Sequence, residues 1–417
     1  MGFLHSDKLI VGYDLGYKTS QISYALSENG EVETLSTVAG SQNYSIPTVL
    51  CKRFGVNQWF YGREALRYAE EDQGILVENL LDLALDGEPV MIEGESFNPV
   101  ALLALFFKRS LGMLSQVGSP DKITSMIVTC PSMDRRMMDV LGEVVDGLNL
   151  KADRVFFRNH TESFYDYMIH QPKELWAHQT LVFHYRENDV KLYNLECNRR
   201  TTPIVTFVEE KVFSFEEYPR LEEKDDETFL EIAQKVCGEE LISCIYLIGE
   251  GFSGDWMKNS LRYLCQGRRV FQGNNLFSKG ACYGMQELLQ ETEVGKAHVF
   301  LGNDKLKANI GMKILRNGED SYYALLDAGG NWYEAEHFME FYLQDGNSFE
   351  VMITPLIGRN AKTVVITLED LPGNIARLQL HIFMESESKL VLEVTDLGFG
   401  EFRTPSGKVW TESVEIY

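Results

Sequence analysis

The sequence predicts a two-lobed α/β domain followed by an all-β domain. A strand, a short turn and a second strand occupy residues 9–22, and the same arrangement recurs at residues 180–193. Strands and helices alternate up to about residue 290, which is typical of sheets covered by helices. After Glu291 the apolar residues follow only the period-two pattern of strands.

We expect three parts along the chain. The first lobe should span residues 8–178, and a shorter second lobe should span residues 179–290. A β-sandwich should occupy residues 297–417, because apolar residues alternate at 378–384 and again at 390–394 after an exposed turn.

The composition is that of a large, acidic globular protein. With 417 residues, 44% of them hydrophobic, the chain can bury a sizeable core in two or three domains. Lys and Arg number 39 against 62 Asp and Glu, and the resulting net charge of -23 repels nucleic acid and anionic membranes. We therefore expect no nucleic-acid partner and no membrane partner.

The cysteines and the apolar runs indicate a cytoplasmic protein. The seven cysteines are scattered and never spaced as a ligand pair, which argues against a disulfide framework and a structural zinc site. Residues 1–7 lack the charged and apolar regions of a signal peptide. The longest apolar run, residues 100–107, is too short to span a bilayer.

The first lobe opens with a buried strand from Leu9 that ends at Asp14 and Gly16. An acid at a strand end, followed by a glycine turn and hydroxyl side chains, suits a phosphate and its Mg²⁺. A plain hairpin is the alternative for such a turn. Asn29-Gly30 predicts a two-residue hairpin into a third strand at residues 32–38.

The remainder of the first lobe should alternate between helices and strands. Asn98 and Pro99 mark a helix start, since Asn caps the first turn and Pro already has a helical φ. We expect a helix at 99–114, a strand at 123–129, a helix at 135–148, a strand at 154–157 and a helix at 162–169.

The second lobe repeats the opening hairpin and then differs from it. We expect strands at 180–193 and 202–213, a helix at 227–236, a strand at 244–248, and helices at 255–264 and 279–289. Gly249-x-Gly251-x-x-Gly254 fits a dinucleotide-binding fingerprint. The acid that should bind a ribose after the next strand is missing, which disfavours that function.

Taken together, these motifs resemble the actin-like ATPase superfamily, and within it the DnaK-type heat-shock chaperones most of all. Residues 11–16 with Ser20 are similar to the first phosphate loop of that superfamily, and residues 127–131 to its strand ending in a small residue and proline. Residues 248–251 are similar to its adenosine turn and 279–284 to its late helix. The resemblance implies an actin-like, ribonuclease H-like fold over most of residues 8–290.

The resemblance also implies a nucleotide site. It would bind ATP with Mg²⁺, which Asp14 would hold through water. The implied nucleotide-binding residues are Asp14, Gly16, Thr19, Ser20, Gly249 and Gly251. If the chain hydrolyses ATP, the candidate catalytic residues are Asp14 and Glu162.

The C-terminal part resembles the peptide-binding β-domain of the same chaperones. This likeness is carried by Leu371-Pro372-Gly373, by the strands at 378–384 and 390–396, and by Gly398-Phe399-Gly400. It implies a protein or peptide partner. No long helix follows Asp396, so we expect no helical lid.

Two departures from the family pattern argue against ATPase activity. The second phosphate loop should contain an aspartate and several glycines, but residues 184–189 read His-Tyr-Arg-Glu-Asn-Asp. Side chains at glycine positions crowd a phosphate, and Glu187 adds negative charge. The span 190–244 is also too short for the subdomain that forms one wall of the adenine pocket, so we expect that subdomain to be missing.

The sequence thus favours a degenerate pseudo-ATPase that acts as a protein-binding or scaffold module. The first alternative is a chaperone-like protein that binds ATP and hydrolyses it slowly or only with a partner. The second alternative is a small-molecule kinase of the same superfamily. The all-β C-terminal part offers no obvious acceptor site for such a kinase.

Overall fold

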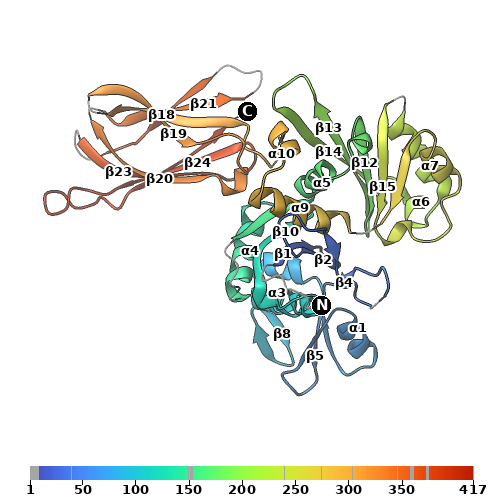
Figure 1. Ribbon diagram of the computed structural model, residues 1–417. Coiled ribbons are helices and arrows are strands. Elements are labelled where there is room, and N and C mark those ends of the chain that lie inside the picture. Colours follow the sequence, from blue (N-terminus) through green and yellow to red (C-terminus); the bar gives the residue numbers. More distant parts are fainter. Residues whose placement is uncertain are drawn as a thin grey trace, which may run out of the picture. The chain divides into compact units, whose positions relative to one another are not determined.

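The chain forms two compact units, Met1–Phe300 and Leu301–Tyr417. The computed structural model describes residues 9–38, 40–148, 150, 154–238, 240–273, 275–302, 304–316, 318–344, 346–356, 361–371 and 375–416. The first unit mixes strands and helices, and the second is built from strands (Figure 1).

The first unit contains two six-stranded sheets that share strand order and directions over five of their strands. The first sheet has the order β11-β10-β1-β2-β3, with β4 also paired to β2, and the second has the order β16-β15-β12-β13-β14-β17. In each sheet the central strand, β1 or β12, pairs antiparallel with the next strand of the chain. The same central strand pairs parallel with a strand that comes much later.

The repeated hairpin of the sequence therefore corresponds to a repeated topology. The strands of the first sheet are β1 (Leu9–Leu15), β2 (Thr19–Ala25), β3 (Glu33–Thr34), β4 (Ile46–Pro47), β10 (Ile123–Cys130) and β11 (Arg154–Asn159). Those of the second are β12 (Gln179–Tyr185), β13 (Asp189–Asn198), β14 (Ile204–Ser214), β15 (Ile242–Ile248), β16 (Arg269–Gln272) and β17 (His298–Phe300).

The third strand of the first sheet is much shorter than the predicted 32–38. Side-chain hydroxyl groups compete with strand pairing for backbone hydrogen bonds there. Ser36 Oγ donates to the carbonyl of Val38, and Thr37 Oγ1 donates to that of Asn43. The predicted two-residue hairpin at Asn29-Gly30 is also replaced by a wider loop, in which Gly30 N donates to Ser27 O over 3.1 Å.

The two halves differ in what they insert before their parallel strands. Between β3 and β10 the chain adds three helices and two small sheets. These are β5 (Leu50–Arg53), β6 (Trp59–Tyr61), α1 (Gly62–Glu70), β7 (Gly74–Val77), α2 (Leu80–Asp86), β8 (Val90–Ile92), β9 (Glu95–Phe97) and α3 (Pro99–Leu111). Between β14 and β15 it adds only α6 (Pro219–Glu222) and α7 (Asp226–Cys237). The second half is therefore the smaller one.

Each half contributes a helix that packs on the other half. Helix α5 (His160–Ile169) follows β11 of the first sheet, yet Phe164 and Met168 pack against Val182 and Tyr246 of the second. Helix α9 (Leu276–Leu289) follows β16 of the second sheet, yet its Ala281 lies in a cluster with residues of β1 and β10. Both helices thus lie between the sheets and contact each other (Figure 1).

Outer helices cover the remaining faces. On the first sheet, Tyr13 of β1 stacks on Phe107 of α3, with ring centroids 3.9 Å apart. Helix α4 (Arg135–Leu148) packs against α3. On the second sheet, Phe229 and Ile232 of α7 fill a core cluster, and α8 (Asn259–Leu264) packs against α7.

Two glycines one helical turn apart let α9 approach α5. A methyl group at Gly280 would lie 2.7 Å from the carbonyl carbon of Ser163 and still closer to its oxygen. One at Gly284 would meet Asp166 and Arg158, which form an ion pair with each other. The crossing of these two helices therefore requires both glycines.

The second unit is a pair of four-stranded antiparallel sheets, preceded in the chain by α10 (Glu293–Ala297) of the first unit. The sheet orders are β19-β18-β21-β22 and β20-β23-β24-β25. The strands are β18 (Ala308–Arg316), β19 (Glu319–Leu326), β20 (Glu336–Gln344), β21 (Ser348–Pro355), β22 (Lys362–Thr367), β23 (Ile375–Met384), β24 (Lys389–Asp396) and β25 (Val409–Glu415). Inward residues such as Leu380, Leu392 and Ile353 are fully buried.

Some helix boundaries differ from the predicted ones. Three helices begin away from the predicted residue: α5 at His160, α8 at Asn259 and α9 at Leu276. Residues 1–7 and the Pro372-Gly373 pair lie outside the described residues. Within the described part of the chain, no helix combines the length and apolar character needed to cross a membrane.

Candidate functional site

A cavity of about 860 Å³ lies in the first unit where the turns of the two repeated hairpins face each other. The β1–β2 turn contributes Gly16, Tyr17 and Lys18, and the β12–β13 turn contributes the run from Arg186 to Asn188. Further walls come from α2, from the start of α5 and α9, and from the turn after β15.

Asp14 and His184 occupy equivalent positions in the two halves. Each is the sixth residue of a seven-residue central strand. Asp14 pairs with Gln21 across the hairpin and with Thr129 of the parallel strand, while His184 pairs with Lys191 and Ile248 in the same way. The position of the second half that is equivalent to Asp14 therefore carries an imidazole and not a carboxylate.

Asp14 is held by a histidine from α5. The Nε2 atom of His160 lies 2.8 Å from Asp14 Oδ1. His160 is only 2% exposed, and its ring stacks on Phe277 of α9 at 3.8 Å with the planes 8° apart. Its Nδ1 atom is buried and has no hydrogen-bond partner within the described residues. The aspartate at the base of the cleft is thus already engaged by the chain itself.

His184 lies beside this pair. Its ring centroid is 6.3 Å from that of His160 and 5.7 Å from that of Phe277. Burial lowers the pKa of His184 well below its ordinary value of 6.5, and the neighbouring charges of His160, Arg186 and Lys191 lower it further. His184 is therefore neutral near pH 7 and cannot replace a carboxylate as an anionic group.

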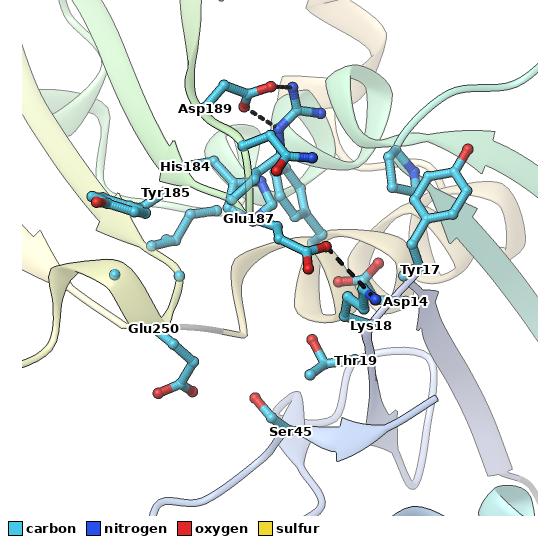
Figure 2. A pocket seen from close by; sticks show the side chains of 18 of the residues that line it. Asp14, Tyr17, Lys18, Thr19, Ser45, His184, Tyr185, Glu187, Asp189 and Glu250 are labelled. Atoms are coloured by element: carbon cyan, nitrogen blue, oxygen red, sulfur yellow. Dashed lines mark hydrogen bonds and ion pairs between the residues drawn. The ribbon is translucent and has the colours of Figure 1, made fainter. Parts of the chain in front are cut away.

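The second turn is shaped by its own side chains. Arg186 donates to both oxygens of Asp189 over 2.6 Å, and Arg186 N also donates to Asp189 O over 2.8 Å. Figure 2 shows Glu187 directed across the cavity toward Lys18 of the first turn, and these two groups form an ion pair of 3.7 Å. Lys18 also donates to Asn79 Oδ1 over 3.1 Å.

An aromatic ring supports the glycine turn after β15. Gly249 has φ 100°, a conformation that side chains other than glycine rarely adopt. A methyl group at Gly251 would lie 2.5 Å from Tyr185 Cε1 and closer still to Cγ and Cδ1 of the same ring. The ring of Tyr185 is fixed by Phe252 and Trp256, and its hydroxyl donates to Leu221 O. The turn therefore rests directly on a packed tyrosine.

The charges that line the cavity are mostly negative. Its lining includes three basic residues, Lys18, Arg186 and Lys224, and five acidic residues, Asp14, Asp82, Glu187, Asp189 and Glu250. In the described part of the chain there is no group of three His, Cys, Asp or Glu side chains placed to hold a metal ion. The cavity thus offers a polyanion neither a positive field nor a preformed metal site.

Family models match nearly the whole chain. Residues 31–303 match the C-terminal model of DUF5716, a family of unknown function. The chain belongs to the DUF5716 family. Residues 305–416 match DUF8552, a domain of unknown function. A comparison with curated proteins returns no match. The DUF5716 match contains His160, the second turn and Gly249, and it begins after the first turn.

The structure brings most of the predicted nucleotide-site residues of this DUF5716 member to the cavity. Asp14, Gly16, Thr19, Gly249 and Gly251 all line it. Ser20, the remaining one, does not line the cavity; it is fully buried in β2, with its hydroxyl 2.9 Å from Thr48 Oγ1.

Glu162, the second candidate catalytic residue, also lies outside the cavity lining. Its carboxylate is 3.4 Å from Arg158 Nε and is nearly buried. The reason is the start of α5: Asn159 caps this helix by accepting from Glu162 N over 2.9 Å, which makes Glu162 the third helical residue. His160, two residues earlier, therefore occupies the cleft instead.

Sequence reasoning missed His160 as the partner of Asp14. The signal was present, because Asn159-x-x-Glu162 is a capping-box pattern that fixes the helix start. Nothing local to the sequence predicted the Lys18–Glu187 pair, which depends on how two turns 169 positions apart face each other.

Proposed function

We propose that this chain is a divergent relative of the actin-like ATPases and DnaK-type chaperones that works as a protein-binding module without ATPase activity. One observation carries the proposal: Asp14 is bonded to His160 at the base of the cleft, and the equivalent position of the other half is His184 rather than an acid. The repeated sheet topology supports the proposed relation to this superfamily.

The engaged Asp14 argues against Mg²⁺-nucleotide binding. Mg²⁺ requires oxygen ligands in near-octahedral geometry and is usually held through carboxylates and water. The 2.8 Å hydrogen bond of Asp14 to His160 occupies Oδ1, which leaves Oδ2 as the only carboxylate oxygen that this histidine does not engage. Burial of the His160 ring and its stacking on Phe277 hold this hydrogen bond in place.

The second turn argues in the same direction. Loops that bind phosphate closely present backbone N–H groups and few side chains. Here Arg186 turns back onto Asp189, and the Glu187 carboxylate lies in the cavity beside Lys18. An incoming triphosphate would meet this carboxylate and the acidic majority of the lining.

A second candidate function is nucleotide binding with slow or partner-dependent hydrolysis. Two observations favour it: the cavity is large enough for a nucleotide, and its lining keeps Gly249 and Gly251 in a turn without obstructing side chains. Under this alternative, Lys18 would leave Glu187 to bind a phosphate.

Calorimetry with ATP and with ADP in the presence of Mg²⁺ tests the proposal. We expect no binding to the full chain at about 1 mM nucleotide. At this concentration even weak binding, with a Kd of about 1 mM, would be detected. The test includes Asp14→Ala and, as a matched control, Asp82→Ala, which removes an exposed carboxylate from the cavity wall.

Micromolar binding that Asp14→Ala abolishes and Asp82→Ala leaves unchanged would overturn the proposal and support the second candidate. Absence of binding in all three proteins supports the proposal that the cleft no longer binds nucleotide. Phosphate release assays would then show no ATP hydrolysis above the rate of buffer alone.

A further inference from the structure

One side of the β-sandwich in the second unit is left open. Strands β19 and β20 are the edge strands of their two sheets. They lie on the same side of the sandwich, because Tyr323 Oη of β19 is 3.4 Å from His337 Nε2 of β20. We call β20 together with β19 the open edge. No further strand of the described residues pairs with either strand on its outer side.

The opposite side of the sandwich is closed by side chains. There, the edge strands are β22 and β25. Lys362 Nζ donates to Glu415 O over 3.0 Å, and Lys408 Nζ and Trp410 Nε1 both donate to Glu369 O, over 2.9 and 3.0 Å. Among the described residues, these three hydrogen bonds link the two sheets on this side, whereas Tyr323–His337 links them on the side of the open edge.

Burial falls off at the open edge. The inward residues of β23, such as Leu378 and Leu380, are 0% exposed. In the neighbouring β20, the corresponding inward residues Met339, Phe341 and Leu343 are only half-buried. On the outer face of β20, Phe338 is 56% exposed and Tyr342 is 60% exposed. This strand thus presents apolar surface on both faces beside an unpaired backbone edge.

β20 lacks most of the features that usually protect an edge strand. Such strands are commonly interrupted by Pro, by bulges or by inward-pointing charges, often Lys. The sequence of β20, Glu-His-Phe-Met-Glu-Phe-Tyr-Leu-Gln, contains no Pro, Gly or Lys. It pairs with β23 in one register from Glu336 to Gln344 without a bulge. A long, regular and partly apolar edge of this kind is suited to strand addition.

The charge of this region indicates what kind of strand would be added. Between residues 319 and 356 the sequence contains no Lys or Arg. It contains eight acidic residues: Glu319, Asp320, Asp327, Glu334, Glu336, Glu340, Asp345 and Glu350. Two of them, Glu336 and Glu340, lie on the outer face of β20, where His381 and Arg377 of β23 pair with them. The other six carry the remaining negative charge of this stretch. A basic strand is complementary to this surface, whereas an acidic one is repelled.

We propose that the open edge accepts an extended, basic segment of a partner protein, which adds to the sandwich as a strand beside β20. The partner alternates apolar or β-branched residues, which cover Met339, Phe341 and Leu343, with Lys or Arg, which complement the net negative charge of residues 319–356. This inference rests on the proposed protein-binding function and names its surface and its partner class.

The experiment uses the full chain and a fluorescent nine-residue peptide that alternates Lys and Val, the length of β20. Anisotropy titration should show saturable binding, and the same peptide with Glu in place of Lys should not bind. Hydrogen exchange of the complex should show new protection at β20 amides and none at β25, because an added strand bonds to the backbone of β20.

Matched variants distinguish the open edge from general charge effects. Phe338→Lys and Val409→Lys each replace a side chain that is 56% exposed, on β20 and β25 respectively. We expect Phe338→Lys to weaken binding of the Lys-Val peptide by about tenfold, since it removes an aromatic cross-strand contact and adds a like charge. Val409→Lys should leave the affinity within about twofold of the starting protein.

The proposal is overturned if the peptide does not bind, if the Glu peptide binds equally well, or if both variants lose the same affinity. It is also overturned if β20 is already protected in a concentration-dependent dimer, because the occupant would then be a second copy. Each outcome is independent of nucleotide binding, so failure of this inference is distinguishable from failure of the pseudo-ATPase proposal.

Discussion

The helix crossing beneath the cleft makes a quantitative prediction. Gly280→Ala places a methyl group 2.7 Å from the carbonyl carbon of Ser163, whereas carbon atoms pack optimally at about 3.5–4.0 Å. The carbonyl oxygen of Ser163 lies closer still, so helices α5 and α9 must separate by more than about 1 Å to relieve the overlap. That movement pulls His160, on α5, away from the Phe277 ring, on α9.

The expected cost follows from overpacking of a tight interface. Inserting a methyl group into such a site costs about 1–3 kcal/mol. The helix propensity of Ala offsets only about 0.5–1 kcal/mol of this. Gly142→Ala is the matched control, because Gly142 lies within α4 and a methyl group there has no neighbour within 4 Å. The same substitution should stabilise the protein by about 0.5–1 kcal/mol at that position.

Urea unfolding monitored by tryptophan fluorescence measures both effects. The midpoint should fall for Gly280→Ala and rise for Gly142→Ala, with little change in the slope of either transition. A Gly280→Ala protein as stable as the starting protein would refute the argument that α5 and α9 are in glycine-dependent contact. So would equal shifts in the two variants, because only one of the sites is crowded.

Two further predictions concern buried polar groups. The pKa of His184 is well below 6.5 in the folded chain, so the unfolded chain takes up the proton first and stability falls as the pH drops below about 6.5. Between pH 7.5 and 5.5 the starting protein should lose up to about 1 kcal/mol more stability than His184→Gln does. Parallel pH profiles of the two proteins would contradict this prediction. In the second unit, the buried Asp396 accepts from Gly398 N, Ser406 N and Arg403 Nη2 at 3.1, 3.0 and 2.8 Å. Asp396→Asn should cost about 1.5–3 kcal/mol in thermal unfolding, against less than about 0.5 kcal/mol for the exposed control Asp370→Asn. Equal losses in the two variants would contradict the role given to Asp396.

Local signals in the sequence predicted much of the first unit. Asn98 and Pro99 do start α3, with Asn98 Oδ1 accepting from Ala101 N, and α4 occupies the predicted residues 135–148. These features depend on neighbouring residues, which the sequence displays directly. The shortened β3 shows the limit, since a few serine and threonine hydroxyls outweigh strand propensity there.

The candidate site was predictable in its backbone but not in its side-chain partners. Glycine turns and strand ends identified Asp14, Gly16 and Gly249, because such turns have a sequence signature. The bond from His160 to Asp14 joins residues 146 positions apart and depends on the placement of α5 between the sheets. Contacts of that kind arise from tertiary packing, which no local pattern encodes.

The stretch without Lys or Arg between residues 319 and 356 has a practical consequence for mapping any complex. Trypsin cleaves only after Lys and Arg, so β19, β20 and β21 remain on a single fragment from Asn317 to Arg359. Amine-reactive cross-linkers have no lysine to modify along these strands. Reagents that couple to carboxylates, together with a protease of different specificity, are needed to detect a partner at the open edge.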